Sequence, residues 1–302
     1  MSDLSDGPLL RIDKGTGRPV LVSPGRLKRP RNTGPERDGE FDCPFCSGSE
    51  GQTPPEEEAI RTDGSAPDTP GWTARAFKNL FPATHNHEVI AEGDDHTTHA
   101  SELSADILRD SVALYRRRIA AFELRDDVRC AFLFKNVGAA AGASIAHNHS
   151  QLLGLPMIPP RLVSELSACR DGCIHCEEIE SAQAEGRIVH RSDHHVVLAP
   201  STPKLPFETW MLPLAHDDDF LESKHDDDLV RSLAALFAGA TSSFKGGAFN
   251  LCLHRISDED FHWHFELQPR IGNVAALEIG ADMYINAITA QMSAARWRDA
   301  IG

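Results

Sequence analysis

The feature that most constrains the fold of this chain is a set of cysteines and histidines that occurs twice in the same order. One Cys-x-x-Cys pair, Cys43-Pro-Phe-Cys46, precedes the segment His147-Asn-His-Ser-Gln151. A second pair, Cys173-Ile-His-Cys176, precedes His262-Trp-His264. A single copy of either element is weak evidence, but two copies in one order predict a duplicated structural unit.

The spacing within the two copies supports this duplication. In the first copy, His96 follows Cys46 by 50 residues, and His147 follows His96 by 51. In the second copy, His216 follows Cys176 by 40 residues, and His262 follows His216 by 46. A chain of 302 residues is long enough for two medium domains with their own cores. We place the boundary near Pro159-Pro160 and predict an N-terminal catalytic half, residues 1–158, and a C-terminal half, residues 159–302.

The cysteine pairs and histidines are the ligand types of zinc sites. A Cys₂His₂ site needs two thiolates on a tight turn and two imidazoles from elsewhere, and such closed sites are structural. His96 is preferred over His85, His87 and His99 because it follows a strand predicted at residues 88–92 and divides its interval almost equally. The predicted ligands are Cys43, Cys46, His96 and His147 at the first site, and Cys173, Cys176, His216 and His262 at the second.

Three alternatives to two zinc sites follow from the same residues. The first is that one Cys-x-x-Cys pair is a loop coincidence with buried thiols, which act as small apolar groups. Cys130, Cys169 and Cys252, outside the pairs, are expected to be ordinary buried or surface cysteines. A redox dithiol is disfavoured because neither pair lies at a predicted strand-to-helix start. Iron in one of the two sites is the third alternative.

Composition excludes several classes of partner and location. A net charge of −15 argues against binding to a nucleic-acid backbone, which requires clustered lysine and arginine. The N-terminal residues have neither the basic start nor the apolar stretch of a secretory signal, and no membrane-spanning run follows. We therefore expect a cytoplasmic protein whose paired cysteines hold metal and do not form disulfides.

The alternation of predicted strands and helices predicts an α+β fold of two units whose sheets face or join each other. Residues 47–71, rich in Gly, Pro, Glu and Thr, are interpreted as a surface loop. The run Arg116-Arg117-Arg118 is interpreted as a solvated helix face. Helices are predicted at residues 104–124 and 227–237, and strands at 19–22, 72–78, 88–92, 128–135, 196–199, 209–212 and 249–253.

The segment 147–151 has the residues for phosphoryl chemistry. In an extended chain, alternate side chains share a face, so His147, His149 and Gln151 point the same way. A neutral imidazole can attack phosphorus, which gives a covalent N–P intermediate and ping-pong kinetics. Gln151 can stabilise a phosphate oxygen, and the preceding turn, Gly142-Ala143-Ser144, can offer backbone N–H groups and a hydroxyl. The alternatives for His149 are a second metal ligand or a core histidine.

The second copy lacks these features around its own histidine. Phe265 and Glu266 follow His264 where Ser150 and Gln151 follow His149, and no Gly-Ala-Ser turn precedes it. We therefore expect one active copy and one structural copy.

With these motifs, the chain resembles the galactose-1-phosphate uridylyltransferase family of the histidine-triad superfamily. The resemblance implies that the α+β fold consists of two duplicated histidine-triad-like units, with antiparallel sheets and packed helices. It is most similar to the branch with two Cys/His zinc sites that includes ADP-glucose phosphorylase-like enzymes. The similarity covers most of the chain and is specific only as a set. Its segments are residues 16–30, 43–46, 79–82, 87–90, 134–138, 141–144, 147–151, 262–270, 278–280 and 284–286.

The resemblance implies roles for individual residues. It implies that His149 carries the nucleoside monophosphate and that Gln151 assists, with Ser144 beside them. It also implies a homodimer in which the stretch around Glu278 completes the sugar pocket of the neighbouring subunit. The implied nucleotide-binding positions are Arg26, Arg29, Asn79, Phe81, Asn136, Gly142, Ser144 and Gln151.

Two departures from the family pattern affect the interpretation. Asn148 stands where the family has proline, although the spacing of the two histidines is retained. Residues 272–278 lack the lysine and aromatic side chains expected of a galactose-1-phosphate enzyme.

We predict a nucleotidyltransferase that acts on nucleoside diphosphate sugars and resembles the hexose-1-phosphate uridylyltransferases. The alternatives are a phosphorylase of such sugars, a nucleotide hydrolase, and a non-catalytic nucleotide-binding module stabilised by zinc.

Overall fold

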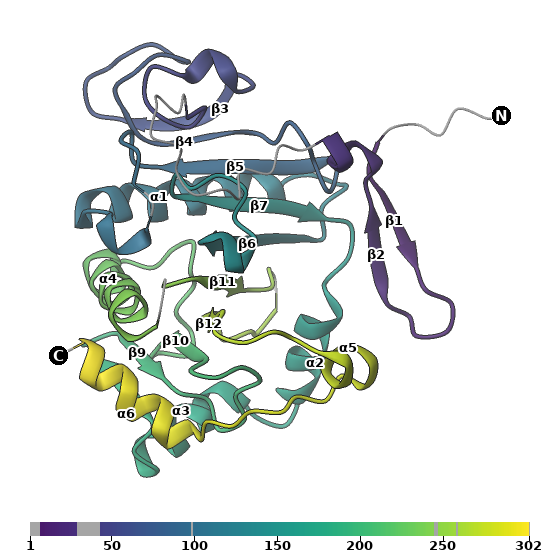
Figure 1. The fold of residues 1–302 in the computed structure, drawn as a ribbon, viewed down its shortest axis with the longest axis vertical. Coiled ribbons are helices and arrows are strands. Elements are labelled where there is room, and N and C mark those ends of the chain that lie inside the picture. The colour runs from purple at the N-terminus through teal and green to yellow at the C-terminus, as the bar shows by residue number, and fades with distance from the viewer. Residues whose placement is uncertain (1–6, 29–42, 98, 245–246, 258, 302) are drawn as a thin grey trace.

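The computed structural model describes residues 7–28, 43–97, 99–244, 247–257 and 259–301. Its centre is a sheet of ten antiparallel strands in the order β3-β4-β5-β7-β6-β11-β12-β10-β9-β8 (Figure 1). The strands of the first half are β3 (Glu56–Arg61), β4 (Trp72–Lys78), β5 (Asn86–Glu92), β6 (Cys130–Val137) and β7 (His149–Leu155). Those of the second half are β8 (Ile188–Arg191), β9 (His195–Leu198), β10 (Thr209–Pro213), β11 (Phe249–His254) and β12 (His264–Pro269).

The strand order shows the duplication directly. From either outer edge inwards, the order of strands is first, second, third, fifth and fourth of each half, and the two fourth strands pair. In that junction, β6 and β11 are antiparallel, with Asn136 opposite Asn250. The predicted α+β fold of two histidine-triad-like units is confirmed, and the two sheets join edge to edge.

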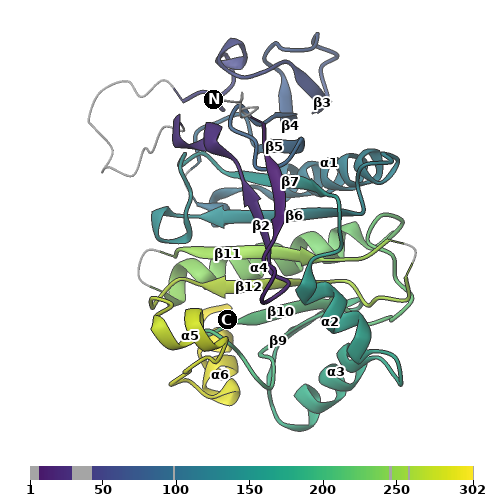
Figure 2. The ribbon, with the colours of Figure 1, turned by 90° about the vertical axis from the view of Figure 1, so that its right-hand side faces the viewer.

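Helices cover both faces of this sheet. Helices α1 (Ala105–Glu123) and α4 (Asp226–Ser243) pack on one face, and α6 (Ala290–Ile301) packs against α4 (Figures 1 and 2). Alternate residues of β9 point to opposite faces, so Val197 belongs to the core under α4 while Val196 belongs to a cluster with α3. On that second side lie α2 (Pro160–Ala168), α3 (Ile174–Ala184) and the short α5 (Ala276–Ala281).

A hairpin of two strands projects beside the main sheet. Its strands are β1 (Leu9–Ile12) and β2 (Pro19–Val22), and the second was predicted at the same residues. Figures 1 and 2 show the hairpin alongside the face of the sheet opposite α1 and α4. Within the described part of the chain, no helix is both long and apolar enough to cross a membrane.

Helix α1 agrees with its prediction, but its arginines do not lie on a solvated face. Ser104 caps the helix by accepting a hydrogen bond from the N–H of Ile107. Arg116 pairs with Asp226 at 2.5 Å and Arg118 with Glu88 at 2.8 Å, and each arginine side chain is only 12% exposed. Only Arg117, 58% exposed, fits the prediction. Carboxylates from distant segments neutralise the other two.

The segment predicted as a surface loop at residues 47–71 contains ordered structure. A short 3₁₀ helix spans Glu50–Gln52, and β3 forms the edge of the sheet. The glutamates of β3 made it look like loop, yet Glu56 pairs with Arg61 and Arg75 at 2.6 and 3.4 Å. Arg75 is almost fully buried, and its ion pair with Glu56 offsets the cost of burying both charges. The sequence pattern does not show this pairing, because the two residues belong to different strands.

A buried carboxylate at the start of α4 permits a prediction about stability. Asp228 accepts hydrogen bonds from the Ser192 hydroxyl, the N–H of His194, Nδ1 of His195 and the Arg231 guanidinium, at 2.6 to 3.1 Å. Burial opposes ionisation of Asp228, but these donors outweigh it and hold its pKa well below the ordinary value. The stability that it contributes is therefore present above about pH 4 and is lost as the pH falls below that.

We expect Asp228→Asn to lower the free energy of unfolding by about 2 kcal/mol at pH 7, because one charged acceptor is lost. The difference from wild type should shrink as the pH is lowered from 4 towards 3. Urea denaturation at both pH values measures it. The control is Asp227→Asn, whose carboxylate is 72% exposed and should contribute less than about 1 kcal/mol. Equal effects of the two substitutions would contradict the assignment.

Candidate active site and metal centres

The histidine segment lies where the predicted metal ligands and the central strands meet. Strand β7 begins at His149 and pairs with β5 and β6, with Ala91 opposite His149 and Phe134 opposite Gln151. The ring of Phe45, between the paired cysteines, contacts the rings of both His147 and His149, at centroid distances of 6.2 and 5.3 Å. The two histidines therefore share one face, as the alternation predicted.

A backbone carbonyl determines the tautomer of His149. Its Nδ1 lies 2.8 Å from the carbonyl oxygen of His147, and a carbonyl can only accept. In the neutral ring, Nδ1 therefore carries the proton and Nε2 carries the lone pair. This is the arrangement that a nucleophilic imidazole needs, since the carbonyl also stabilises the positive charge that develops when Nε2 forms a bond.

His87 orients Gln151, and the sequence did not assign it this role. The N–H of Ala83 donates to Nδ1 of His87 at 2.9 Å, which places the ring proton on Nε2. This Nε2 lies 3.1 Å from Oε1 of Gln151. The amide oxygen thus points towards His87, and the NH₂ group points away from it and can donate to a phosphate oxygen. Both side chains are about 4% exposed.

The glycine-rich turn differs from the expected phosphate loop in one respect. The N–H groups of Gly142 and Ala143 donate to the carbonyls of Ala139 and Gly138, at 3.0 and 3.2 Å. In this conformation they hold the turn together and do not point to a ligand. Gly142 has φ of 88°, a conformation that favours glycine. Ser144 follows in the bend that leads to His147.

A strand of the second half supports this turn. The Asn250 side chain on β11 donates to Oδ1 of Asn136 on β6 at 2.7 Å and to the carbonyl of Ala141 at 2.9 Å. Asn250 thus contacts the candidate site, and the sequence did not suggest it. Only the pairing of β6 with β11 brings it to the predicted nucleotide-binding position Asn136.

Three other predicted nucleotide-binding residues lie together before β5. The Arg26 guanidinium donates to the carbonyl of Phe81 at 2.7 Å, and Oδ1 of Asn79 accepts from the N–H of Phe81 at 2.8 Å. Nδ2 of Asn79 lies 3.3 Å from Nε2 of His87, so this segment adjoins the histidine that orients Gln151, although both nitrogens are donors in this tautomer. Arg29 lies outside the described residues.

Glu278 and His149 belong to elements that lie apart within one chain. Glu278 belongs to α5, beside α2, whereas β7 lies in the other half of the molecule (Figure 1). Its carboxylate accepts hydrogen bonds from the N–H groups of Ala275 and Ile285, at 3.0 and 3.4 Å. A role in the sugar pocket therefore requires a second subunit and stays a prediction.

The first set of predicted metal ligands converges. The ligand atoms of Cys43, Cys46, His96 and His147 all lie within 4.8 Å of one another. Sγ of Cys46 is 3.5 Å from Nδ1 of both histidines. Nε2 of His147 lies 3.0 Å from the carbonyl of Gly93, so Nε2 carries the proton and Nδ1 presents its lone pair to the thiolates. Burial lowers the pKa of His147 to about 4, which favours this neutral form.

The second set converges in the same way. Cys173, Cys176, His216 and His262 also place their ligand atoms within 4.8 Å of one another. Both histidines direct Nε2 to an acceptor: His216 to Asp260 at 2.7 Å, and His262 to the carbonyl of Pro213 at 2.9 Å. Such outer contacts orient metal-bound imidazoles. Cys173 is the N-cap of α3, so this pair begins a helix, although a turn and not a strand precedes it.

The distances fit a tetrahedral ion. Zn–S bonds of about 2.3 Å and Zn–N bonds of about 2.05 Å give a sulfur–nitrogen edge of about 3.6 Å in a tetrahedron. The sulfur–nitrogen distances at the two clusters are 3.5 to 3.6 Å. None of the seven cysteines, all of which lie in the described ranges, forms a disulfide. Both clusters are therefore compatible with metal binding.

The counterpart of His149 in the second half is enclosed. His264 has no exposed surface, and the ring of His175 lies 4.3 Å from it, where Phe45 stands in the first half. Glu266, the counterpart of Gln151, forms an ion pair with Arg161. A protein side chain thus occupies the position next to Glu266, which agrees with a structural role for this copy.

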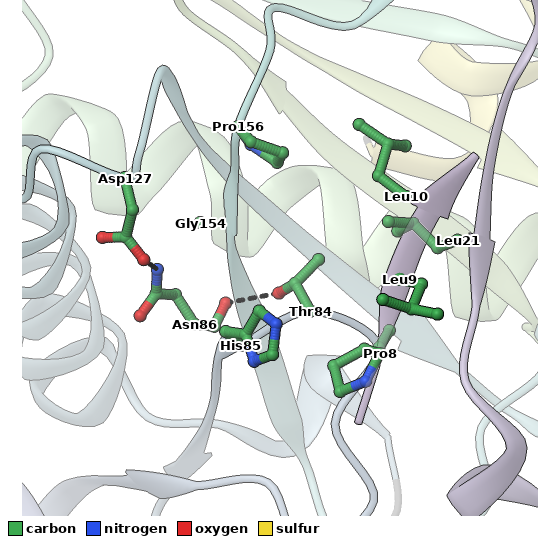
Figure 3. A pocket seen from close by; sticks show the side chains of 11 residues that line it. Pro8, Leu9, Leu10, Leu21, Thr84, His85, Asn86, Asp127, Gly154 and Pro156 are labelled. Atoms are coloured by element: carbon green, nitrogen blue, oxygen red, sulfur yellow. Dashed lines mark hydrogen bonds between the residues drawn. The ribbon is translucent and has the colours of Figure 1, made fainter. Parts of the chain in front are cut away.

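An apolar pocket at the far end of β7 is not part of this site. Figure 3 shows it between the β1–β2 hairpin and the ends of β5 and β7, with a volume of about 130 Å³. Gly154 in its wall is five residues from His149, about 17 Å along a strand. Asn86, Asp127 and Thr84 in its wall already bond to one another, as Asn86 does to Asp127 at 2.8 Å.

The fold and the two His-x-His segments define a duplicated histidine-triad-like protein with two Cys/His clusters. Comparison with known proteins agrees. A family described as the N-terminal domain of DUF4931, a domain of unknown function, matches residues 71–158, which include β4 to β7. This match contains His147, His149 and Gln151 but neither cysteine pair.

Relatives match almost the whole chain. An ADP-glucose phosphorylase of Arabidopsis thaliana is 28% identical over 94% of this chain and 90% of its own length. A crystal structure of an ADP-glucose phosphorylase from that plant with bound ADP-glucose superposes with a TM-score of 0.76 at 27% identity, covering 97% of this chain and 99% of that one. A galactose-1-phosphate uridylyltransferase of Thermotoga maritima is 24% identical over 96% and 98%. The resemblance to the galactose-1-phosphate uridylyltransferase family, including its ADP-glucose phosphorylase-like members, is confirmed.

Proposed function

We propose that this protein is a nucleotidyltransferase that acts on nucleoside diphosphate sugars through a covalent nucleotide on His149. The observation that carries the proposal is the bond from Nδ1 of His149 to the carbonyl of His147, which directs the lone pair to Nε2. Gln151 stands two residues further on the same face, with its amide oriented by His87. The relatives that cover nearly the whole chain are enzymes of this type.

The reaction divides into two displacements. In the first, Nε2 attacks the α-phosphorus of the donor, an N–P bond forms, and the bond to the bridging oxygen breaks, so that the sugar 1-phosphate leaves with the electron pair. In the second, an oxygen of the acceptor attacks the same phosphorus and the N–P bond breaks. The NH₂ group of Gln151 donates to the charged phosphate oxygens in both steps.

We propose a hexose 1-phosphate as the acceptor, which makes the protein hexose-1-phosphate uridylyltransferase-like and places it in carbohydrate, including galactose, metabolism. Inorganic phosphate is the alternative, because the Arabidopsis relative that shares 28% identity is a phosphorylase. Water as the acceptor would make the protein a hydrolase. The residues around His149 serve all three reactions alike, since they contact the transferred nucleotide and not the acceptor.

We also propose zinc as the ion at both Cys/His clusters, with a structural role. The donor set of two thiolates and two imidazoles suits zinc, and the four ligands leave no position for substrate. A homodimer is proposed in addition, with Glu278 serving the site of the neighbouring subunit. Exposed apolar side chains near Glu278, such as Ile279, Met283 and Ile285, support such an interface.

The proposal is tested by intact-mass spectrometry of the protein mixed with UDP-glucose, ADP-glucose or a GDP-sugar, without acceptor and under conditions that preserve N–P bonds. We expect a mass gain of one nucleoside monophosphate, whose value identifies the base. Adding a hexose 1-phosphate or inorganic phosphate should then discharge the adduct, and the effective compound identifies the acceptor. Nucleotide binding without any adduct would favour the non-catalytic binding module.

A further inference from the structure

A buried polar network lies behind the strand that carries His149. Glu92 on β5 accepts from the ammonium of Lys135 on β6 and from the hydroxyl of Ser150 on β7, both at 2.5 Å, and from the hydroxyl of Tyr115 on α1. Tyr115 and Ser150 are also 2.9 Å apart. These side chains are between 1% and 7% exposed, so the network is closed to water. We call these four residues the Glu92 network.

The network is attached to the segment that bears the candidate nucleophile. Ser150 stands between His149 and Gln151, and its side chain points to the opposite face because neighbours in a strand alternate. The N–H of Glu92 also donates to the carbonyl of Asn148 at 3.0 Å. Glu92 thus holds residues 148 and 150, on both sides of His149, through one backbone bond and one side-chain bond.

The second half shows that the fold does not require this network. Lys135 and Ile90 are the partners of Ser150 in the sheet, and Leu253 and Met211 are the corresponding partners of Phe265. Glu92 lies two residues after Ile90, where Pro213 lies two residues after Met211. In the second copy, leucine, phenylalanine and proline therefore occupy the positions that correspond to Lys135, Ser150 and Glu92.

Stability alone does not account for a charged pair at this position. Removing a carboxylate and an ammonium from water costs desolvation energy that their attraction often fails to recover, and apolar replacements are often neutral or stabilising. A fully bonded polar network does fix one geometry, because its hydrogen bonds are directional and their loss in a dry interior is costly. Burial raises the pKa of Glu92, but Lys135, Ser150 and Tyr115 outweigh it, so that the carboxylate stays ionised.

We propose that Glu92, Lys135 and Tyr115 are positioning residues for nucleotidyl transfer. Through Ser150 and Asn148 they fix the start of β7, and with it the separation between Nε2 of His149 and the amide of Gln151. The inference rests on the proposed function. A displacement of about 1 Å between reacting groups can cost about a hundredfold in rate.

The test replaces the charged pair by the chemistry of the second copy, in the double variant Glu92→Leu/Lys135→Leu. The matched control is Glu88→Leu/Arg118→Leu, which removes an ion pair between β5 and helix α1. Glu88 lies on the same face of β5 as Glu92 but has no recorded bond to Ser150. Single-turnover adduct formation gives the rate of transfer, and titration of nucleoside monophosphate gives affinity. We expect a 10- to 100-fold lower rate for the network variant, with affinity within about threefold of wild type, and a near-normal rate for the control.

Several outcomes would overturn the inference. They are a wild-type rate in the network variant, a rate loss that only follows lost affinity, or an equal loss in the control. If the double variant does not fold, Ser150→Ala removes the link alone and should still lower the rate at least fivefold, with unchanged metal content. A wild-type protein that forms no adduct would reject the proposed function, an outcome separate from these.

Discussion

His149→Ala is expected to abolish the nucleotide adduct and to lower the rate of transfer by at least about 10⁴-fold, the scale seen when an enzyme loses its nucleophile. The physical reason is that the alanine side chain cannot form the N–P bond. Little stability should be lost, because Nδ1 of the imidazole bonds to the carbonyl of His147, only two residues away in the chain. Intact mass after incubation with donor, with circular dichroism to confirm folding, measures both effects.

The second half provides a matched control in His264→Asn. His264 has the same bond, from Nδ1 to the carbonyl of His262 at 3.1 Å, but is enclosed. This variant should form the adduct at a rate close to wild type for the folded fraction. An adduct that survives in His149→Ala would place the nucleophile elsewhere. His149→Asn adds a further check, because a mere binding module would keep its affinity and never show an adduct.

Disrupting the two Cys/His clusters should have unequal effects on activity. We expect Cys46→Ser to release one metal ion, to lower stability by about 3 kcal/mol or more and the melting temperature by roughly 10 °C, and to prevent adduct formation. His147 both belongs to this cluster and supplies the carbonyl that orients His149. Loss of the ion therefore removes the support of the nucleophile.

Cys176→Ser should lower stability to a similar extent but leave the adduct intact in the protein that stays folded. The corresponding carbonyl, of His262, orients only the enclosed His264. Metal content by elemental mass spectrometry, thermal unfolding and adduct formation should be measured on the same samples. Loss of the adduct in both variants, or in neither, would contradict the coupling of the first cluster to His149.

Features carried by nearby residues could be predicted from the sequence. The period of apolar residues and the Ser104 cap defined α1, and the Cys-x-x-Cys pairs in a repeated order defined both clusters. The face shared by His147 and His149 follows from strand alternation. In each case the signal lies within a few residues or in a pattern that occurs twice.

Features that depend on distant partners could not be predicted. His87 and Gln151 are 64 residues apart, and Asn250 and Asn136 are 114 apart. No local pattern indicates such pairs. The glutamates of β3 resembled a loop because the arginine that neutralises them, Arg75, belongs to the next strand. Backbone geometry was equally inaccessible, since only the folded turn shows that Gly142 and Ala143 use their N–H groups internally.

The junction of β6 and β11 means that neither half is a self-sufficient module. Separation between residues 158 and 159 would expose two long central strands as bare sheet edges, which invite pairing with other chains. The first half would also lose Asn250, whose side chain donates a hydrogen bond to the carbonyl of Ala141 in the glycine-rich turn. The second half therefore supports the segment around His149 through this shared edge, although its own His264 is enclosed.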